Sequence, residues 1–411
     1  MSNPRPARRL AFVIHDLNTW GGMERCTLEV ARRLSRRWPV DVHAYRLDDP
    51  SLTCGGWGDV RFRRVRFRPR GPELPRFLYF HAVTSWKLLR RRRGRTGALI
   101  HAAGACTQVS DVIQVHFVHA AWKAKRATLP DHLRLPVRAA SARGLAVPFL
   151  RAYNELVLIV SVLTERIAFR PGRTFVAVSH IVARELEEHL GLREQVHVIH
   201  HGVDTEVFHP MGEEDRRVVA DLRRSWGADD GDMVVLLVGA YDRKGLAPAL
   251  EALGAMEALV RARIRLVAVG GGNPERFMSR ARSLGIADQV KLLPHTRQIA
   301  PLYRASDVFL LPTLYEPFGL VVLEAMACGL PAIVSHDAGA AELIRHGESG
   351  LLLRDPADHQ EIARALQDLA ADADLRRRMG RQALETASAR TWDRVAVEYE
   401  RLLEPLMETA G

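Results

Sequence analysis

The feature that most constrains this chain is a regular alternation of apolar and amphipathic segments between residues 233 and 353. The short apolar segments are predicted strands: Met233–Gly239, Ile264–Gly270, Val290–Leu293, Val308–Leu311, Ala332–Ser335 and Gly350–Leu353. Helices are predicted between them, at Leu246–Val260, Pro274–Leu284, Ile299–Ala305, Leu320–Cys328 and Ala340–His346. Strands that are apolar along their length and separated by helices are typical of a parallel sheet covered on both faces. This half of the chain is therefore predicted to be a Rossmann-like α/β domain.

The first half shows the same alternation less regularly. Predicted strands are Arg9–Leu17, Val40–Leu47, Val60–Phe67, Ala98–Ala103, Val112–Phe117, Thr174–Ser179 and Val196–Ile199, and predicted helices include Pro75–Arg93, Ala140–Ala168 and Ile181–Leu190. A chain of 411 residues suggests two or three domains. We expect one Rossmann-like domain over 1–205, a second over 206–390, and a C-terminal segment, 391–411, whose helix Trp392–Met407 could cross back to the first domain. Since ligands of open parallel sheets bind beyond the carboxyl ends of the strands, the cleft between two such domains is the expected active site.

Charge divides the chain in the same place. Residues 1–205 hold 34 Lys and Arg against 17 Asp and Glu, whereas residues 206–411 hold 25 against 31, which together give a net charge of +11. Arginine clusters stand at Arg61–Arg70 and Arg90–Arg95. These clusters fit solvated faces and loops, or attraction to anionic lipid or nucleic acid, and the sequence leaves both interpretations open.

The cysteines and the apolar runs indicate a cytoplasmic protein. The four cysteines, which lie far apart and without metal-ligand spacing, are expected to be free thiols in a reducing compartment: Cys26, Cys54, Cys106 and Cys328. The first residues contain no apolar segment typical of a signal peptide. The apolar run Leu156–Leu163 is too short to span a bilayer, and we interpret it as part of a buried helix.

Two carboxylates, Glu316 and Glu324, stand in an otherwise apolar stretch. Pro317 disfavours helix at Glu316, which places this residue in the loop after a strand, while Glu324 falls inside the helix that follows. The backbone N–H groups of Phe318, Gly319 and Leu320 would be unpaired at the start of that helix. Carboxylates accept hydrogen bonds from vicinal hydroxyl groups, so this arrangement fits a polyhydroxylated ligand. The same spacing would also arise without a ligand, if one glutamate lay on the surface and the other were paired to an arginine in the core.

The whole segment 316–335, "EPFGLVVLEAMACGLPAIVS", resembles the signature of the retaining glycosyltransferases of family 4, which are two-domain nucleotide-sugar enzymes of the GT-B fold. Other segments resemble the family's motifs in the same order: "WGGMER" (20–25), "VAVSH" (176–180), "HGVDTEVFHP" (201–210), "VLLVGAYDRKGL" (235–246) and "AGAAELIRHGESGLLL" (338–353). The resemblance covers about residues 9–405 and is most specific over 195–355. Within the family it is closest to the glycogen synthase and lipopolysaccharide-core glucosyltransferase group.

The resemblance implies roles for individual residues of the second half. Glu324 resembles the carboxylate that binds the donor ribose, and Glu316 the contact to hydroxyls of the transferred sugar, with help from the N–H groups of Phe318–Leu320. Arg243 and Lys244 resemble the pair that binds the diphosphate, where two fixed cations would stabilise the charge that develops on the leaving group. Arg297 and Ile299 resemble the loop around the nucleotide base.

The resemblance also implies site residues in the first half. Gly21 and Gly22 open a helix after the first strand, where glycine lets a diphosphate or sugar approach the backbone, although an ordinary turn would use the same residues. His116 resembles the family's first-domain histidine near the donor sugar, and His119 competes for that role. The chain departs from the family pattern at Ala240, where relatives often have arginine, and at His201, where they have asparagine.

The resemblance predicts a retaining glycosyltransferase that takes a nucleoside-diphosphate sugar, with a UDP-sugar favoured, and acts in cell-envelope or polysaccharide synthesis. The donor would bind mainly the second domain, and the acceptor, a glycan or lipid-linked compound, mainly the first. We expect no cofactor and no catalytic metal, because the D-x-D candidate Asp372–Asp374 lies in a polar helical stretch. We expect no nucleic-acid partner; peripheral binding at the inner face of the plasma membrane would follow from the basic first half. The alternatives are a basic peripheral-membrane or nucleic-acid-binding protein on a degenerate transferase scaffold, and a nucleotide-sugar epimerase of the same fold.

Overall fold

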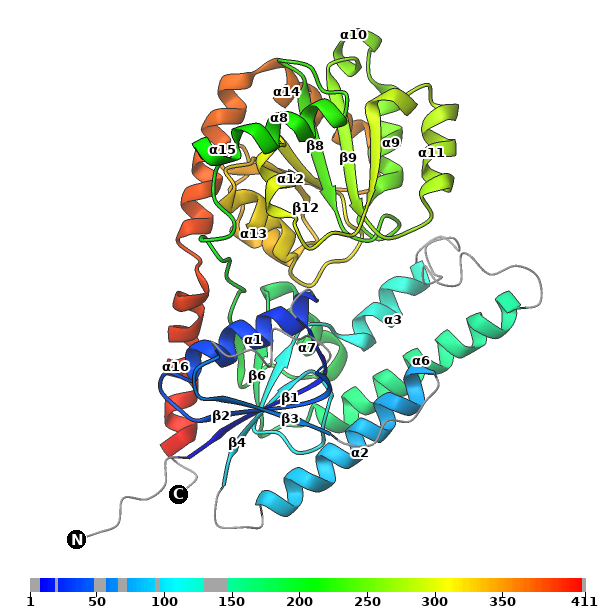
Figure 1. Ribbon diagram of the computed structural model, residues 1–411. Helices are drawn as coiled ribbons and strands as arrows, with labels where there is room; N and C mark the ends of the chain where they lie inside the picture. The colour runs from blue at the N-terminus through cyan, green and yellow to red at the C-terminus, as the bar shows by residue number, and fades with distance from the viewer. Residues whose placement is uncertain are drawn as a thin grey trace. The chain divides into compact units, whose positions relative to one another are not determined.

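The computed structural model describes residues 8–18, 21–47, 57–65, 72–92, 97–128 and 146–408 (Figure 1). These residues form two compact units. The first unit contains the described residues up to 128 together with 148–201 and 392–408, and the second contains 202–391. The C-terminal helix α16 (Trp392–Glu408) thus belongs to the first unit, where Asp393 pairs with Arg36 (2.8 Å) on the chain segment after α1.

The first unit is built on a seven-stranded parallel sheet in the order β3-β2-β1-β4-β5-β6-β7. Its strands are β1 (Leu10–Leu17), β2 (Val40–Leu47), β3 (Val60–Arg64), β4 (Leu99–Ala103), β5 (Val112–Val115), β6 (Thr174–Ala177) and β7 (Val196–Val198). Its other helices are α1 (Gly22–Leu34), α2 (Glu73–Arg92), α3 (His119–Thr128), α6 (Ala146–Ala168) and α7 (His180–Leu190). Phe80 and Leu88 of α2 pack against Val13 and Ile100 of the sheet, which removes these apolar side chains from water.

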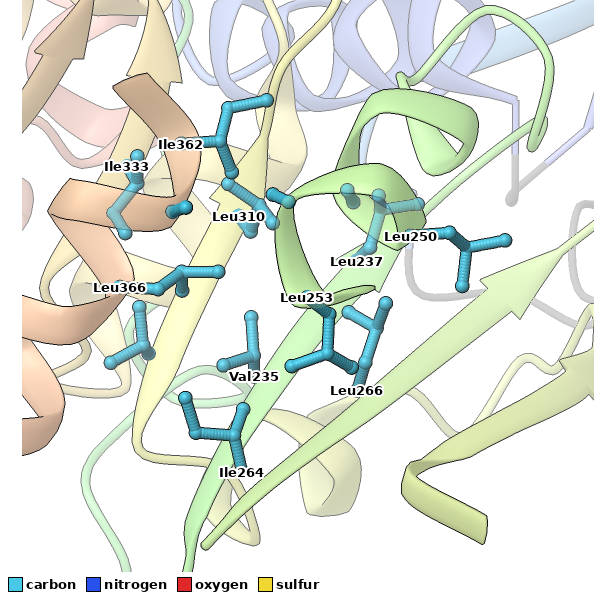
Figure 2. Packing of buried hydrophobic residues seen from close by; sticks show 14 of the residues in the cluster. Val235, Leu237, Leu250, Leu253, Ile264, Leu266, Leu310, Ile333, Ile362 and Leu366 are labelled. Atoms are coloured by element: carbon cyan, nitrogen blue, oxygen red, sulfur yellow. The ribbon is translucent and has the colours of Figure 1, made fainter. Parts of the chain in front are cut away.

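The second unit is built on a six-stranded parallel sheet in the order β10-β9-β8-β11-β12-β13. Its strands are β8 (Met233–Val238), β9 (Ile264–Gly270), β10 (Val290–Pro294), β11 (Val308–Leu311), β12 (Ala332–Ser335) and β13 (Gly350–Leu353). Its helices are η2 (Glu213–Asp215), α8 (Arg216–Ser225), α9 (Leu246–Ala255), α10 (Ala258–Arg261), α11 (Pro274–Ser283), η3 (Ala287–Gln289), α12 (Ala300–Arg304), α13 (Leu320–Ala327), η4 (Gly339–Leu343), α14 (His359–Ala371) and α15 (Ala373–Ser388). Figure 2 shows the buried layer in which Leu250 and Leu253 of α9 and Leu366 of α14 meet the strands. The predicted pair of parallel-sheet α/β domains is confirmed.

Two predicted helices of the second unit differ from the structure. The helix expected over Leu246–Val260 is interrupted, because Met256 is extended and buried, and α10 begins after it. The helix expected over Ala340–His346 is the short 3₁₀ segment η4. The first backbone N–H groups of η4 donate to the loop after β11: Gly339 N donates to Glu316 O (2.9 Å), and Ala340 N donates to Phe318 O (2.7 Å).

The interpretation of Leu156–Leu163 as part of a buried helix is wrong. These residues lie on α6, and Leu156 and Leu163 are about half exposed, whereas Leu158 and Val162 between them are buried. The helix therefore buries one apolar face and exposes another, which an apolar run alone does not reveal. No helix in the described part of the chain is both long and apolar enough to cross a bilayer.

The remaining expectations about thiols and basic clusters are only partly covered by the structure. Cys26, Cys106 and Cys328 are free and buried, while Cys54 lies outside the described residues. Residues 66–70 of the first arginine cluster and 93–95 of the second also lie outside them. The described start of the first cluster, Arg61–Arg64, belongs to strand β3 at the edge of the sheet.

Candidate active site

The candidate site of the second unit lies where the strand order reverses. β8 and β11 are neighbours at the centre of the sheet, and the strands that follow each of them in sequence lie on opposite sides. Open parallel sheets bind ligands beyond the carboxyl ends of the strands at such a reversal of strand order. The loop after β8 carries Arg243 and Lys244, and the loop after β11 carries Glu316.

Lys244 and Glu316 meet at this point as an ion pair. Both side chains are mostly buried, with 15% and 18% of the side-chain surface exposed. Burial, and after it the positive charge of Arg243, lowers the pKa of Lys244 to about 7. Arg243 itself is exposed and has no ion-pair partner among the described residues. The site thus holds two adjacent cations and a single carboxylate that neutralises one of them.

Backbone contacts fix the two loops against each other. Thr313, which is fully buried, donates from Oγ1 to the carbonyl oxygen of Arg243 (3.0 Å). Gly245 has a left-handed backbone (φ 80°) and lies so close to the carbonyl of Pro312 that a Cβ atom would collide with it. Lys244 consequently reaches Glu316 from a loop whose position allows little variation.

The loop that carries Glu316 is also held from the β12 side. The carbonyl oxygen of Glu316 accepts the N–H of Gly339, and the carbonyl oxygen of Phe318 accepts the N–H of Ala340. Phe318 is buried. Gly319, in a left-handed conformation (φ 98°), starts α13. The N–H groups of Gly319 and Leu320 donate to no group in the described part of the chain. They are thus unpaired at the start of the helix, and their binding of a ligand stays a prediction.

Glu324 lies on α13 and is only 4% exposed. Its Oε2 accepts a hydrogen bond from Oη of Tyr303 on α12 (2.9 Å), and Tyr303 is fully buried. Tyr303 was not predicted as a site residue, because an aromatic residue in a short predicted helix carries no local signal for this contact. Arg297 and Ile299 lie just before α12, in the segment that follows β10. Arg297 is exposed. The carbonyl oxygen of Ile299 accepts the N–H of Tyr303 (3.3 Å), so this segment is bonded to α12, the helix whose Tyr303 contacts Glu324.

The first unit presents a different set of groups. Gly21 caps α1 and Gly22 begins it, after β1. A Cβ atom on Gly21 would collide with the carboxylate of Glu24, so the absence of a side chain here makes room for Glu24. Burial, followed by the nearby charge of Asp16, raises the pKa of Glu24. A carboxyl group over this helix start favours a hydroxylated ligand there and disfavours a diphosphate, since two anions repel.

His116 and His119 have different surroundings. His116 follows β5, stacks on His201 at 5.2 Å between ring centroids, and its Nε2 has no hydrogen-bond partner within the described residues. Burial, and after it the proximity of His101, lowers the pKa of His116 to about 3, so its ring is neutral at pH 7. His119 instead pairs through Nδ1 with buried Glu165 (2.9 Å), whose carboxylate also accepts the N–H groups at the start of α3. His119 is therefore engaged at the start of α3, whereas Nε2 of His116 is buried and has no hydrogen-bond partner within the described residues.

The residues of the D-x-D segment serve helix α15. Asp372 Oδ1 accepts the N–H of Leu375 (2.8 Å) and caps the helix, and Asp374 pairs with Arg377. Their carboxylates are thus engaged with the helix that they begin.

Comparison with known proteins adds to this geometry. The model described as "Glycosyl transferases group 1" matches residues 218–386, and the model described as "Glycosyltransferase Family 4" matches residues 20–207. The chain belongs to the group 1 glycosyltransferases of family 4. The first match falls on the second unit and includes both glutamates and the Arg243–Lys244 pair, and the second falls on the first unit and includes His116.

Relatives of this glycosyltransferase are enzymes of the same type. It is 29% identical to a D-inositol 3-phosphate glycosyltransferase of Stackebrandtia nassauensis, over 92% of this chain and 85% of that one. It is 28% identical to an N-acetyl-alpha-D-glucosaminyl L-malate synthase of Bacillus anthracis, over 55% of this chain and 58% of that one. The glycosyltransferase is accordingly a hexosyltransferase-type enzyme.

A solved structure shares the whole fold. Anabaena Alr3699/HepE, solved in complex with UDP-glucose, matches the glycosyltransferase with a TM-score of 0.70 over 97% of this chain and 99% of that one, at 20% identity. The match confirms the GT-B fold, in which two parallel-sheet α/β domains share one chain.

Proposed function

We propose that this glycosyltransferase is a retaining, metal-independent enzyme that transfers a sugar from a nucleoside-diphosphate sugar, with a UDP-sugar favoured. The donor binds the second unit, and the acceptor binds mainly the first. The observation that carries the proposal is the Lys244–Glu316 ion pair at the point where the strand order reverses, with Glu324 on the helix that follows. A UDP-glucose complex of a protein with the same fold supports the choice of UDP.

The two groups of the ion pair have separate partners in the donor. The diphosphate takes Lys244 and Arg243 as counter-charges, which releases Glu316 to accept hydrogen bonds from hydroxyls of the transferred sugar. Glu324, held by Tyr303, accepts hydrogen bonds from the ribose. As the glycosidic bond breaks, negative charge grows on the diphosphate, and cations that are already in place stabilise it without having to reorganise.

The proposed transfer keeps the configuration of the anomeric carbon. The bond from this carbon to the diphosphate oxygen breaks, and the acceptor hydroxyl oxygen bonds to the same face of the carbon through an oxocarbenium-like state. The proton of the acceptor hydroxyl passes to the departing phosphate oxygen. The family resemblance assigns His116 of the first unit to the donor sugar, and burial keeps its ring neutral at pH 7.

We further propose that the acceptor is a hydroxylated compound with a negative charge. The two relatives act, by their names, on an inositol phosphate and on malate, both small anionic compounds. The excess of Lys and Arg in residues 1–205 favours an anionic acceptor. A lipid-linked phosphate or an acidic glycan of the cell envelope has the same chemistry.

A panel of nucleotide sugars tests the donor assignment. A ligand that binds only the folded protein raises its melting temperature, so UDP-sugars are expected to stabilise the protein more than sugar phosphates without a nucleoside. Transfer to a panel of inositol phosphates, hydroxy acids and lipid-linked phosphates then identifies the acceptor. Activity is expected to persist in EDTA; loss in EDTA with recovery on adding manganese would contradict the metal-independent mechanism. An altered nucleotide sugar formed without any acceptor would indicate an epimerase instead.

A further inference from the structure

Helix α6 exposes a continuous apolar stripe. Five large apolar side chains recur at intervals of three, four or seven residues along it and are 44–75% exposed: Phe149, Leu156, Ile159, Leu163 and Ile167. This spacing places them along one side of the helix. The opposite side, which includes Leu158 and Val162, is buried in the first unit.

Helix α2 exposes a second apolar stripe. Leu78, Trp86 and Leu89 are 42%, 52% and 45% exposed. The guanidinium of Arg90 lies over the ring of Trp86 at 4.0 Å. The two helices are neighbours, since the N–H of Leu74 donates to Oη of Tyr153 on α6 (3.2 Å), and Figure 1 shows them running side by side.

This concentration of apolar surface is particular to α2 and α6. Eight of the thirteen exposed large apolar side chains among the described residues lie on these two helices. The other five are scattered over the rest of the described chain: Val207, Met211, Val218, Leu259 and Val397. Single exposed apolar residues are ordinary, whereas a contiguous patch indicates an interaction surface.

Unpaired cations border the same surface. Lys123 and Arg166 line a pocket of about 220 Å³ together with Ile159, Val162 and Leu163. Neither cation has an ion-pair partner within the described ranges. The one exposed carboxylate on the described parts of α3 and α6 is Glu155, which Arg126 neutralises (2.7 Å). Helix α7, whose His189 also lines the pocket, carries exposed Glu188 and exposed Glu187, which pairs with Arg193 (3.5 Å). The surface therefore combines apolar side chains with two cations that have no ion-pair partner among the described residues.

We propose that α2 and α6 form a docking face for an anionic phospholipid bilayer. The exposed stripes enter the boundary between headgroups and acyl chains, and Lys123 and Arg166 hold a lipid phosphate at the pocket. Helices with an apolar face and basic flanks lie in the membrane interface in this way, and tryptophan is enriched at that depth. A second copy of the chain is disfavoured as the occupant, because a symmetric contact would bring the same positive charges together. The proposal does not depend on the sugar-transfer assignment.

Co-sedimentation of the full-length chain with vesicles tests the docking face. Binding is expected to vesicles that contain phosphatidylglycerol, to be much weaker with phosphatidylcholine alone, and to fade with salt, since screening shortens the reach of the charges. Exchanging Leu156, Ile159 and Leu163 for serine together is expected to lower the partition coefficient about a hundredfold. The double variant Lys123→Gln/Arg166→Gln is expected to lower it about tenfold or more on anionic vesicles alone.

Matched controls separate the face from general effects. The triple exchange of Met211, Val218 and Leu259 for serine removes exposed apolar side chains of the second unit and is expected to leave vesicle binding unchanged. Circular dichroism and UDP-induced stabilisation should be the same in all variants, because every substituted apolar residue is exposed. Lipids brominated near the headgroup should quench wild-type fluorescence more than that of Trp86→Phe.

Several outcomes would overturn the proposal. These are failure to bind anionic vesicles at low salt, equal binding by the α6 variant and the control variant, and binding that ignores lipid charge. A concentration-dependent dimer that the α6 triple variant abolishes would identify a protein partner for this face instead.

Discussion

The two parallel-sheet units share the central strand order but differ in the chemistry at the carboxyl ends of their strands. The second unit places two cations and a carboxylate there, with Lys244 and Glu316 paired. The first places a glycine helix start covered by Glu24 and the neutral ring of His116. One scaffold thus supports a site with two cations that suits a diphosphate and a site with a carboxyl group and a neutral imidazole that suits hydroxyl groups. Five predictions test this contrast.

The largest effect is expected from the cations of the second unit. Lys244→Ala and Arg243→Ala should each lower turnover about a hundredfold or more, as removal of an electrostatic stabiliser does. Steady-state kinetics with a UDP-sugar donor measure the effect. Lys291→Ala, an exposed lysine on β10, is the matched control and should behave like the wild type. Equal activity of all three variants would remove the diphosphate assignment.

The two glutamates should separate nucleotide binding from transfer. Glu324→Gln is expected to weaken UDP binding about tenfold to a hundredfold, because a hydrogen bond to a charged group contributes about 1.5–3 kcal/mol. Glu316→Gln should abolish most transfer yet change UDP affinity less than about threefold. Loss of the carboxylate frees Lys244 to bind the diphosphate, which strengthens UDP binding, but it also lowers the pKa of Lys244 further, which weakens UDP binding. Isothermal titration with UDP measures both.

Tyr303 offers a finer test of the same site. Tyr303→Phe should weaken UDP several-fold and weaken 2′-deoxy-UDP or 3′-deoxy-UDP less, because Tyr303 acts through the carboxylate that binds the ribose hydroxyls. Equal losses for UDP and both deoxy analogues would show that Tyr303 supports only packing.

The interior of the first unit should be the more sensitive to acid. Burial lowers the pKa of His101 to about 3, and both of its ring nitrogens have no partner within the described residues. The unfolded chain takes up the proton near pH 6.5 and the folded chain only near pH 3, so stability is lost as the pH falls through this window. Between pH 7 and pH 5 the loss is about 2 kcal/mol for this group.

Hydrogen exchange can locate that loss. Amides of β4 and β5 should gain exchange on going from pH 7 to pH 5, after correction for intrinsic rates, more than amides of β8 and β11. His101→Gln should remove about half of the difference, because burial lowers the pKa of His116, which follows β5, to about 3 as well. An equal response of the two sheets would contradict the assignment.

The smallest effect concerns pH and nucleotide affinity. Because the pKa of Lys244 is about 7, the lysine is charged below pH 7 and must take up a proton to bind a diphosphate above it. UDP affinity is therefore expected to fall about tenfold between pH 6 and pH 8. Lys244→Arg, which stays charged, should flatten this dependence, whereas His116→Gln should leave it unchanged.

The two parallel-sheet units and the loop position of Glu316 could be predicted from the order of residues along the chain. Apolar strands alternate with helices in a period that few folds accommodate, and Pro317 restricts the backbone locally. These signals lie within a few residues of the feature that they predict. The family resemblance then pointed to Lys244, Arg243 and Glu324 as a group.

Which groups contact one another could not be predicted in the same way, because it depends on how distant segments pack. Lys244 pairs with Glu316 across 72 positions of the chain, and Tyr303 reaches Glu324 from a different helix. The exposure of one side of α6 could not be predicted either, because an apolar run has the same sequence whether both sides of its helix are buried or one side is exposed to solvent. Local spacing constrains backbone conformation, whereas the partner of a side chain depends on how distant segments pack.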